Sequence, residues 1–200
     1  LAFADRGQFV ADPDFVQAPR GDWKTLWHPA YLKQRSSLIG AQSMKVAQPG
    51  NPAGMKSAFA PMPSQEEYGI SVIDKDGNAV AMTTTIEAVF GSRLMVNSGQ
   101  GRQGGFLLNN ELTDFSFAPT DAKGLPIANR VEGGKRPRSS MSPTLVFEKD
   151  SGKLKMTGGS PGGAVIIHYT GKLLIGTLQW GLNTQQAISL PNFSSLNGPT

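Results

Sequence analysis

Residues 134–144 read GKRPRSSMSPT, and residues 158–163 read GGSPGG. The run between them predicts a β-hairpin, with strands over 144–148 and 153–157 and a turn at Asp150-Ser151-Gly152. After the second motif, apolar residues recur at helical spacing from residue 162 to about Trp180, and Gly181 is the stop signal. The glycine-rich segment therefore lies between a strand and a helix, where outward-pointing amides can hold an anion.

A second hairpin is predicted upstream, where strands over 70–74 and 79–85 flank KDGN at 75–78. Asp-Gly between β-rich runs is a strong hairpin signal. Near the other end, Asn183 is expected to cap a short helix that runs to Leu190 and stops at Pro191. Hairpins followed by helices predict an α+β layered domain.

The first 45 residues show helical periodicity only in pieces, because Pro13, Pro19 and Pro29 interrupt it. Residues 32–39 form one short amphipathic candidate. Residues 46–69 are rich in Pro, Gly, Ala, Ser and Met, which predicts a surface segment without regular structure.

The composition excludes several classes of site. The 200 residues carry a net charge of +4, and the only compact basic cluster is Lys135, Arg136 and Arg138. No aromatic side chains interleave with this cluster, so it predicts a solvated or carboxylate-binding loop and no nucleic-acid partner. The chain has no cysteine, and its two histidines are too far apart in sequence to suggest a zinc site. No apolar run approaches the ~18–20 residues that span a bilayer.

Two further motifs complete an ordered series: DKDGNAVAMTTT at 74–85 and GFLLNNELTDF at 105–115. In this order the four motifs resemble the gamma-glutamyltransferase family of N-terminal-nucleophile hydrolases, over the whole chain. The resemblance implies a four-layer αββα sandwich, present here as a fragment. Residues 1–69 would then be the end of the large-subunit region with its processing loop, and residues 70–200 a truncated small-subunit region.

The resemblance also implies an activity: hydrolysis or transfer of a gamma-glutamyl or related acyl group from glutathione-type amides, through an acyl-enzyme and without a metal or organic cofactor. It assigns the oxyanion site to Gly162 and Gly163. The remaining positions fall to residues that would hold the substrate or the nucleophile: Ser139 and Ser140 for the substrate α-carboxylate, Glu111 and Asp114 for its ammonium group, Glu87 for a further substrate contact, and Thr85 for a hydrogen bond to the nucleophile.

Two of these positions depart from the family pattern. Glu111 stands where Gln is common, and Glu87 stands where Asn is common. Both changes add negative charge to the expected pocket. In these two positions the chain resembles the branch of the family that includes cephalosporin acylase-like and broader amidase members.

The nucleophile itself is missing from the expected place. The family cleaves itself before a Thr-Thr-His or Thr-Ser-His triplet, and the first Thr becomes the nucleophile. We expect the triplet between Gly69 and Ile70, where the sequence runs on directly. The chain as written is therefore predicted to be inactive. A degenerate homologue, an engineered deletion and an omission of residues from the sequence each explain the gap. The rival function is a catalytically inactive homologue or fragment that keeps part of an amino-acid-binding pocket.

The expected ligand is a small-molecule gamma-glutamyl or related acyl donor. In the family the large- and small-subunit regions associate, and the resemblance also allows a homodimer. A periplasmic or secreted location is suggested by the resemblance, while the absence of cysteine is equally compatible with the cytoplasm. Both ends of the chain read as if cut from a longer protein, so the targeting signal is not readable.

Overall fold

A computed structural model describes residues 1–52, 67–97, 99–101 and 104–198 of the chain. Most of the irregular segment expected over 46–69 lies outside the described residues. The chain forms two compact units. The first comprises Leu1–Met62, Leu112–Ser139 and Ser195–Thr200, and the second comprises Pro63–Glu111 and Ser140–Ser194.

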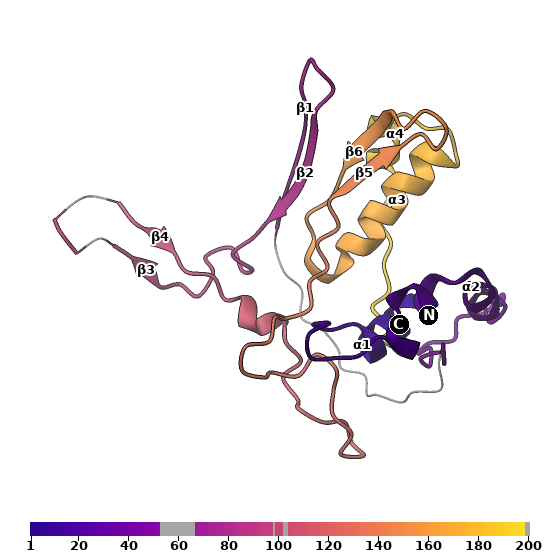
Figure 1. Cartoon of the computed structure of the whole chain (residues 1–200), viewed down its shortest axis with the longest axis horizontal. Helices are drawn as coiled ribbons and strands as arrows, with labels where there is room; N and C mark the ends of the chain where they lie inside the picture. Colours follow the sequence, from indigo (N-terminus) through magenta and orange to yellow (C-terminus); the bar gives the residue numbers. More distant parts are fainter. Residues whose placement is uncertain (53–66, 98, 102–103, 199–200) are drawn as a thin grey trace. The chain divides into compact units, whose positions relative to one another are not determined.

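The first unit contains two short α-helices, α1 (Ala2–Phe9) and α2 (Pro29–Ser36), and between them the 3₁₀ turns η1 (Pro19–Gly21) and η2 (Trp23–Trp27) (Figure 1). Pro29 begins α2 instead of interrupting a helix, because the first helical position needs no N–H donor. The amphipathic candidate over 32–39 is thus confirmed in part, since the helix starts earlier and ends at Ser36.

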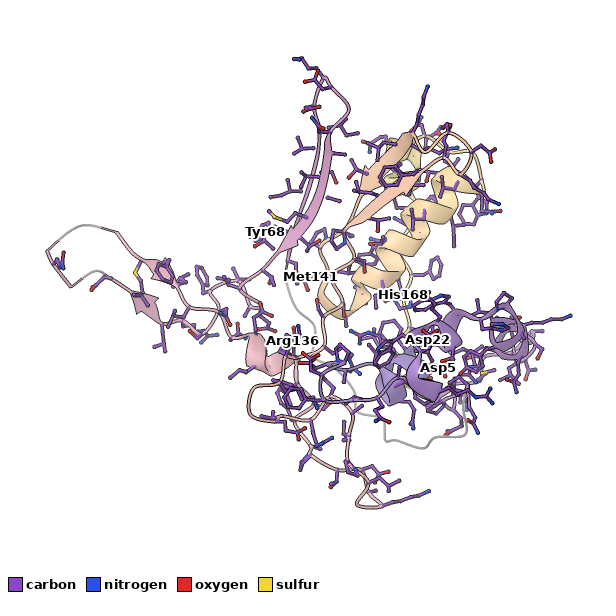
Figure 2. All side chains as sticks on the ribbon, viewed as in Figure 1. Asp5, Asp22, Tyr68, Arg136, Met141 and His168 are labelled. Carbon is purple, nitrogen blue, oxygen red and sulfur yellow. The ribbon has the colours of Figure 1, made fainter. Side chains whose placement is uncertain are left out.

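Asp5 ties the two helices together. Its carboxylate pairs with Arg35 (Nη2 to Oδ1, 3.0 Å) and accepts a hydrogen bond from the Tyr31 hydroxyl at 3.0 Å. The Arg35 and Asp5 side chains are only 10% and 13% exposed, so the ion pair lies in a largely dry interface between the helices. Figure 2 labels Asp5 among the helices of this unit.

In the second unit, β1 (Tyr68–Ile73) and β2 (Ala79–Thr84) form the predicted antiparallel hairpin. Its turn is closed by the Asp74 carboxylate, which accepts hydrogen bonds from the amides of Asp76 and Asn78, both at 2.9 Å. Gly77 has φ +87°, a left-handed conformation that favours glycine. Tyr68 lies at the end of β1 away from the turn (Figure 2).

The other predicted hairpin is β5 (Thr144–Phe147) with β6 (Leu154–Gly158), and α3 (Ile166–Leu178) runs alongside it (Figure 1). The helix begins with a 3₁₀ turn, η4 (Gly163–Val165). A second helix, α4 (Thr184–Ser189), starts with the expected Asn183 cap, which forms a reciprocal pair of hydrogen bonds with Gln186. Ile166 and Ala187 are fully buried in this unit.

Three short elements between residues 95 and 114 were not predicted from the sequence pattern. β3 (Met95–Val96) and β4 (Phe106–Leu107) pair over two residues each, which is too short to show an alternation. The 3₁₀ helix η3 (Glu111–Asp114) covers two of the expected substrate residues. The observed mixture of helices and antiparallel hairpins confirms the α+β class. No helix in the described part of the chain is long and apolar enough to cross a membrane.

Candidate functional site

The GGSPGG segment links β6 to α3 through a backbone that requires glycine. Gly162 has φ +134° and Gly163 has φ +57°, both outside the range that side chains tolerate easily. A Cβ added at Gly162 would also come within 2.9 Å of the Tyr169 ring. Consecutive amides in such a turn form a concave anion site at the start of a helix. The segment therefore has the geometry that oxyanion binding needs.

The two amides converge on one oxygen atom of the chain itself. The Gly163 N–H donates to Glu67 Oε2 at 2.6 Å, and the Gly162 N–H donates to the same oxygen at 3.3 Å. Glu67 is only 5% exposed although it is a carboxylate. Burial of a charge is costly unless hydrogen bonds compensate for it, and the two amides supply that compensation. Sequence reasoning did not identify Glu67.

Thr85 and Glu87 form a local cluster with Asn110 in the same unit. The Thr85 hydroxyl accepts a hydrogen bond from the Glu87 amide at 2.7 Å. The buried Glu87 carboxylate accepts one from the Asn110 side chain, whose carbonyl oxygen in turn accepts the Ala88 amide at 3.0 Å. Glu87 has φ +73°, which is unusual for a residue with a side chain. The network holds this loop in a defined conformation.

The other expected substrate residues are divided between the units. Glu111 and Ser140 belong to the second unit, and Asp114 and Ser139 to the first. Ser140 is buried and its carbonyl accepts the Ser142 hydroxyl at 2.8 Å. The Glu111 amide donates to the Asn109 side chain at 3.0 Å. In the first unit, the carbonyl of buried Asp114 accepts Asn129 Nδ2 at 2.7 Å.

The basic cluster binds carboxylate and carbonyl oxygens inside the first unit. Arg136 pairs with Asp12 (2.8 Å) and Asp14 (2.6 Å). Its hydrogen bonds hold the pKa of Asp12 well below the usual range. Lys135 Nζ donates to the Ala128 carbonyl at 2.7 Å, and desolvation by burial lowers its pKa. The expectation of a carboxylate-binding loop is thus confirmed for Arg136, and the carboxylates that it binds belong to this same chain.

Besides Arg35, two more arginines of this unit, Arg6 and Arg138, are buried, a feature that the sequence pattern did not reveal. Arg138 Nη1 donates to the carbonyls of Arg6 (3.1 Å) and Val10 (3.3 Å), and Arg6 Nη2 donates to the Ser139 carbonyl at 3.1 Å. Burial lowers the pKa of Arg138 to about 9 and that of Arg6 to about 10, so both remain charged at neutral pH. These bonds fix the backbone on which Ser139 sits.

No set of three or more acidic or histidine side chains among the described residues could hold a metal ion.

A cavity of about 110 Å³ adjoins the glycine-rich segment, lined by Gly159, Ser160, Tyr169 and Lys172 among others. The Lys172 ammonium group is already hydrogen-bonded within the chain, because its Nζ donates to the carbonyls of Ile188 (2.9 Å) and Leu190 (2.8 Å).

Comparison with known families identifies the scaffold that carries this glycine-rich turn. The model of the gamma-glutamyltranspeptidase family matches residues 1–199. The chain belongs to the gamma-glutamyltranspeptidase family. It is 37% identical over 200 residues to the glutathione hydrolase proenzyme of Escherichia coli (strain K12), a match that covers 96% of this chain and 31% of that protein. The proenzyme of Bacillus subtilis (strain 168) is also 37% identical, over 96% of this chain and 32% of its own length. The chain thus spans about a third of the length of these relatives.

Solved structures of the family are also similar to this chain. A gamma-glutamyltranspeptidase inhibited by acivicin is 41% identical, with a TM-score of 0.53, and the match covers 63% of this chain and 65% of that one. The Pseudomonas nitroreducens gamma-glutamyltranspeptidase in complex with L-DON is 37% identical, with a TM-score of 0.52 and coverage of 61% and 62%. The family and the α+β class therefore rest on both sequence and structure.

Proposed function

We propose that this chain is part of a gamma-glutamyltranspeptidase-type acyl-transfer scaffold whose substrate is a gamma-glutamyl or related amide. The observation that carries the proposal is the convergence of the Gly162 and Gly163 amides on one carboxylate oxygen. Two backbone donors aimed at one oxygen are what a tetrahedral acyl-transfer intermediate requires. The family membership and the names of the relatives, glutathione hydrolase proenzymes, support the substrate class.

In the proposed reaction an N-terminal Thr hydroxyl attacks the γ-carbonyl carbon, and its own amine takes the proton. The Gly162 and Gly163 amides stabilise the oxyanion, and the amide leaving group departs with a proton. Water or an amine acceptor then releases the acyl group. Thr85 would orient the nucleophile, while the substrate would be held by Glu87, Glu111, Asp114, Ser139 and Ser140. The αββα layering, the division at residues 69 and 70 and the association of two subunit regions belong to the same proposal.

A second candidate is a non-catalytic homologue, and a specific contact favours it for the chain as written. The Glu67 carboxylate fills the amide pair, and none of residues 67–70 has an aliphatic hydroxyl or a thiol. Loss of a catalytic nucleophile commonly costs about six orders of magnitude in rate. The two candidate functions share the same scaffold. They differ in whether that scaffold can catalyse acyl transfer once a nucleophile is supplied.

The test is to supply the nucleophile. Thr-Thr-His is placed at the 67–70 region, in one variant after Gly69 and in another instead of residues 67–69, within the longest chain that the surrounding coding DNA encodes. We expect at least one variant to cleave itself and to release the anilide from a gamma-glutamyl anilide. Matched variants with Ala-Thr-His have the same length without the nucleophile and should do neither. Folded Thr variants without cleavage or turnover would overturn the catalytic proposal.

A further inference from the structure

Glu67 directly precedes β1 and reaches the start of α3, far along the chain, within the second unit. Its Oε2 accepts the amides of Gly162 and Gly163, residues that lie 95 and 96 positions away. The contact combines a charged acceptor, two converging donors and near-complete burial. Charge-assisted hydrogen bonds of this kind are roughly twice as strong as neutral ones. The Glu67 carboxylate is thus bound by the two amides in the way that an anionic ligand would be.

The strand register gives a second, independent placement of Glu67. The ladder ends with Tyr68 paired to Thr84 and Gly69 to Thr83. Continued by one residue, the same register would place Glu67 opposite Thr85. Side chains of directly opposed residues lie on the same face of a hairpin. That face is turned to the glycine-rich segment, because a Cβ on Gly69 would lie 3.8 Å from the Ser160 amide nitrogen.

We propose that Glu67 occupies the place of the nucleophile and that its carboxylate is a built-in ligand that closes the Gly162–Gly163 anion site. Residues 67–69 then stand in place of the Thr-Thr-His triplet, and no residues are missing after Gly69. In this inference the division between the two subunit regions moves from residues 69 and 70 to residues 66 and 67. The claim that Glu67 occupies the place of the nucleophile rests on the proposed function, because the proposed function makes Thr85 the residue that orients the nucleophile. The claim that its carboxylate closes the anion site rests only on the contact between Glu67 and the two amides.

A carboxylate at this position has two consequences. The Glu67 carboxylate supplies the negative charge that an oxyanion would otherwise bring to the two amides. Because Glu67 is part of the same chain, its effective concentration at the amides is high, and an external oxyanion has to compete with it. The carboxylate also lies at the positive end of the α3 dipole, which favours a negative charge. Removal of the side chain should therefore open a site for a small free carboxylate such as formate or acetate.

The first experiment measures that site without reference to catalysis. Glu67→Ala is compared with the parent chain and with Glu148→Ala, an exposed glutamate of the same unit. The readouts are the ¹⁵N-glycine amide resonances of Gly162 and Gly163 and the melting temperature. We expect Glu67→Ala to move both resonances and lower the melting temperature by several degrees. Added formate or acetate should reverse both changes in this variant and do nothing to Glu148→Ala.

Glu67→Gln keeps the shape of the side chain and guards against a variant that does not fold. A neutral oxygen accepts a weaker hydrogen bond, so the Gly162 and Gly163 amide protons should shift upfield. Unchanged glycine resonances in both Glu67 variants would overturn the internal-ligand assignment. A melting temperature of Glu67→Ala that does not respond to either carboxylate would overturn the claim of an opened site.

The second experiment separates the place of the nucleophile from the function. Replacement of residues 67–69 by Thr-Thr-His preserves the β1–β2 register. Insertion after Gly69 adds three residues inside β1, and an odd number turns the preceding side chains to the other face. We expect the replacement to cleave itself and the insertion to stay intact. Cleavage by the insertion alone would overturn the placement, whereas inactivity of both with intact carboxylate rescue would overturn only the proposed function.

Discussion

Asp12 is an acidic residue that the first unit has almost fully removed from water. Its side chain is 1% exposed. It accepts hydrogen bonds from the Arg136 amide (2.8 Å), Nε (3.0 Å) and Nη2 (2.8 Å), and from the Asp14 amide (3.1 Å). These donors favour the charged carboxylate and keep its pKa well below the usual range. The residue therefore couples the stability of the fold to pH.

The sign of this coupling gives a testable pH dependence. Because the folded pKa of Asp12 is depressed, its contribution is fully present above the unfolded pKa of about 3.9 and is lost as the pH falls toward the folded value. We expect Asp12→Asn to be less stable than the parent at neutral pH, with a difference that shrinks below about pH 4. Urea denaturation over a series of pH values measures it.

Asp14→Asn is the matched control for that measurement. Asp14 also contacts Arg136, but its side chain is 73% exposed, so its ion pair should contribute little. The interpretation fails if the two variants show the same change at neutral pH, or if the deficit of Asp12→Asn persists undiminished into acid.

At this scale the sequence predicts only those contacts whose partners are near in the chain. The Asn183 cap belongs to this class, because its side chain bonds to the nearby Gln186. The Asp-Gly turn was predicted as well, but the Asp74 side chain that closes it was not. The contacts of Glu67 and Arg138 do not belong to this class. Their partners lie 95 or more positions away, and no local periodicity encodes such a pairing.

The helices α3 and α4 meet closely at one glycine. A Cβ added at Gly176 would come within 2.9 Å of the Ala187 Cβ, and Ala187 is fully buried on α4. Gly171 lies on the same helix with nothing within 4 Å of an added Cβ. The two glycines thus differ in the space around them and share the same backbone conformation.

This difference predicts opposite effects of one substitution. Gly171→Ala should raise stability by about 0.5–1 kcal/mol, because alanine loses less backbone entropy in a helix. Gly176→Ala gains the same helical preference but must push α4 away, at a cost of about 1–3 kcal/mol. We expect thermal and urea denaturation to show stabilisation for the first variant and net destabilisation for the second. Equal effects would mean that α4 does not pack on α3 in this way.

Elements with strong local signals were predictable, and those without them were not. The Asp-Gly turn and its β-rich flanks correctly indicated β1 and β2, and the Asn183 and Pro191 signals correctly bounded α4. β3 and β4 pair over two residues each, so they carry no alternation to recognise. Pro29 illustrates an ambiguity, because proline reads as a breaker in sequence and here occupies the first turn of α2.

At the scale of the whole molecule, the ordered motifs correctly predicted the family. The expected site residues, however, are divided between the two units. Most of the expected site residues belong to the second unit, while Asp114 and Ser139 belong to the first. The first unit fixes Ser139 through Arg6 and the backbone beside it through Arg138. Ser139, which is proposed to bind substrate, is therefore anchored by contacts that no single motif contains. The assembly of one substrate pocket from the expected site residues remains a prediction.

The last prediction concerns the integrity of the chain. Self-cleavage in this family type needs a hydroxyl or thiol that attacks the preceding carbonyl and takes the acyl group from nitrogen to oxygen, and residues 67–70 offer no aliphatic hydroxyl or thiol for this step. The Glu67 carboxylate also fills the pair of amides, Gly162 and Gly163, to which the proposed function assigns an oxyanion. We expect intact-mass measurement and denaturing electrophoresis to show one chain of 21.3 kDa that does not change on prolonged incubation. A time-dependent split between residues 66 and 70 would refute this, and a split elsewhere that a protease inhibitor abolishes would not.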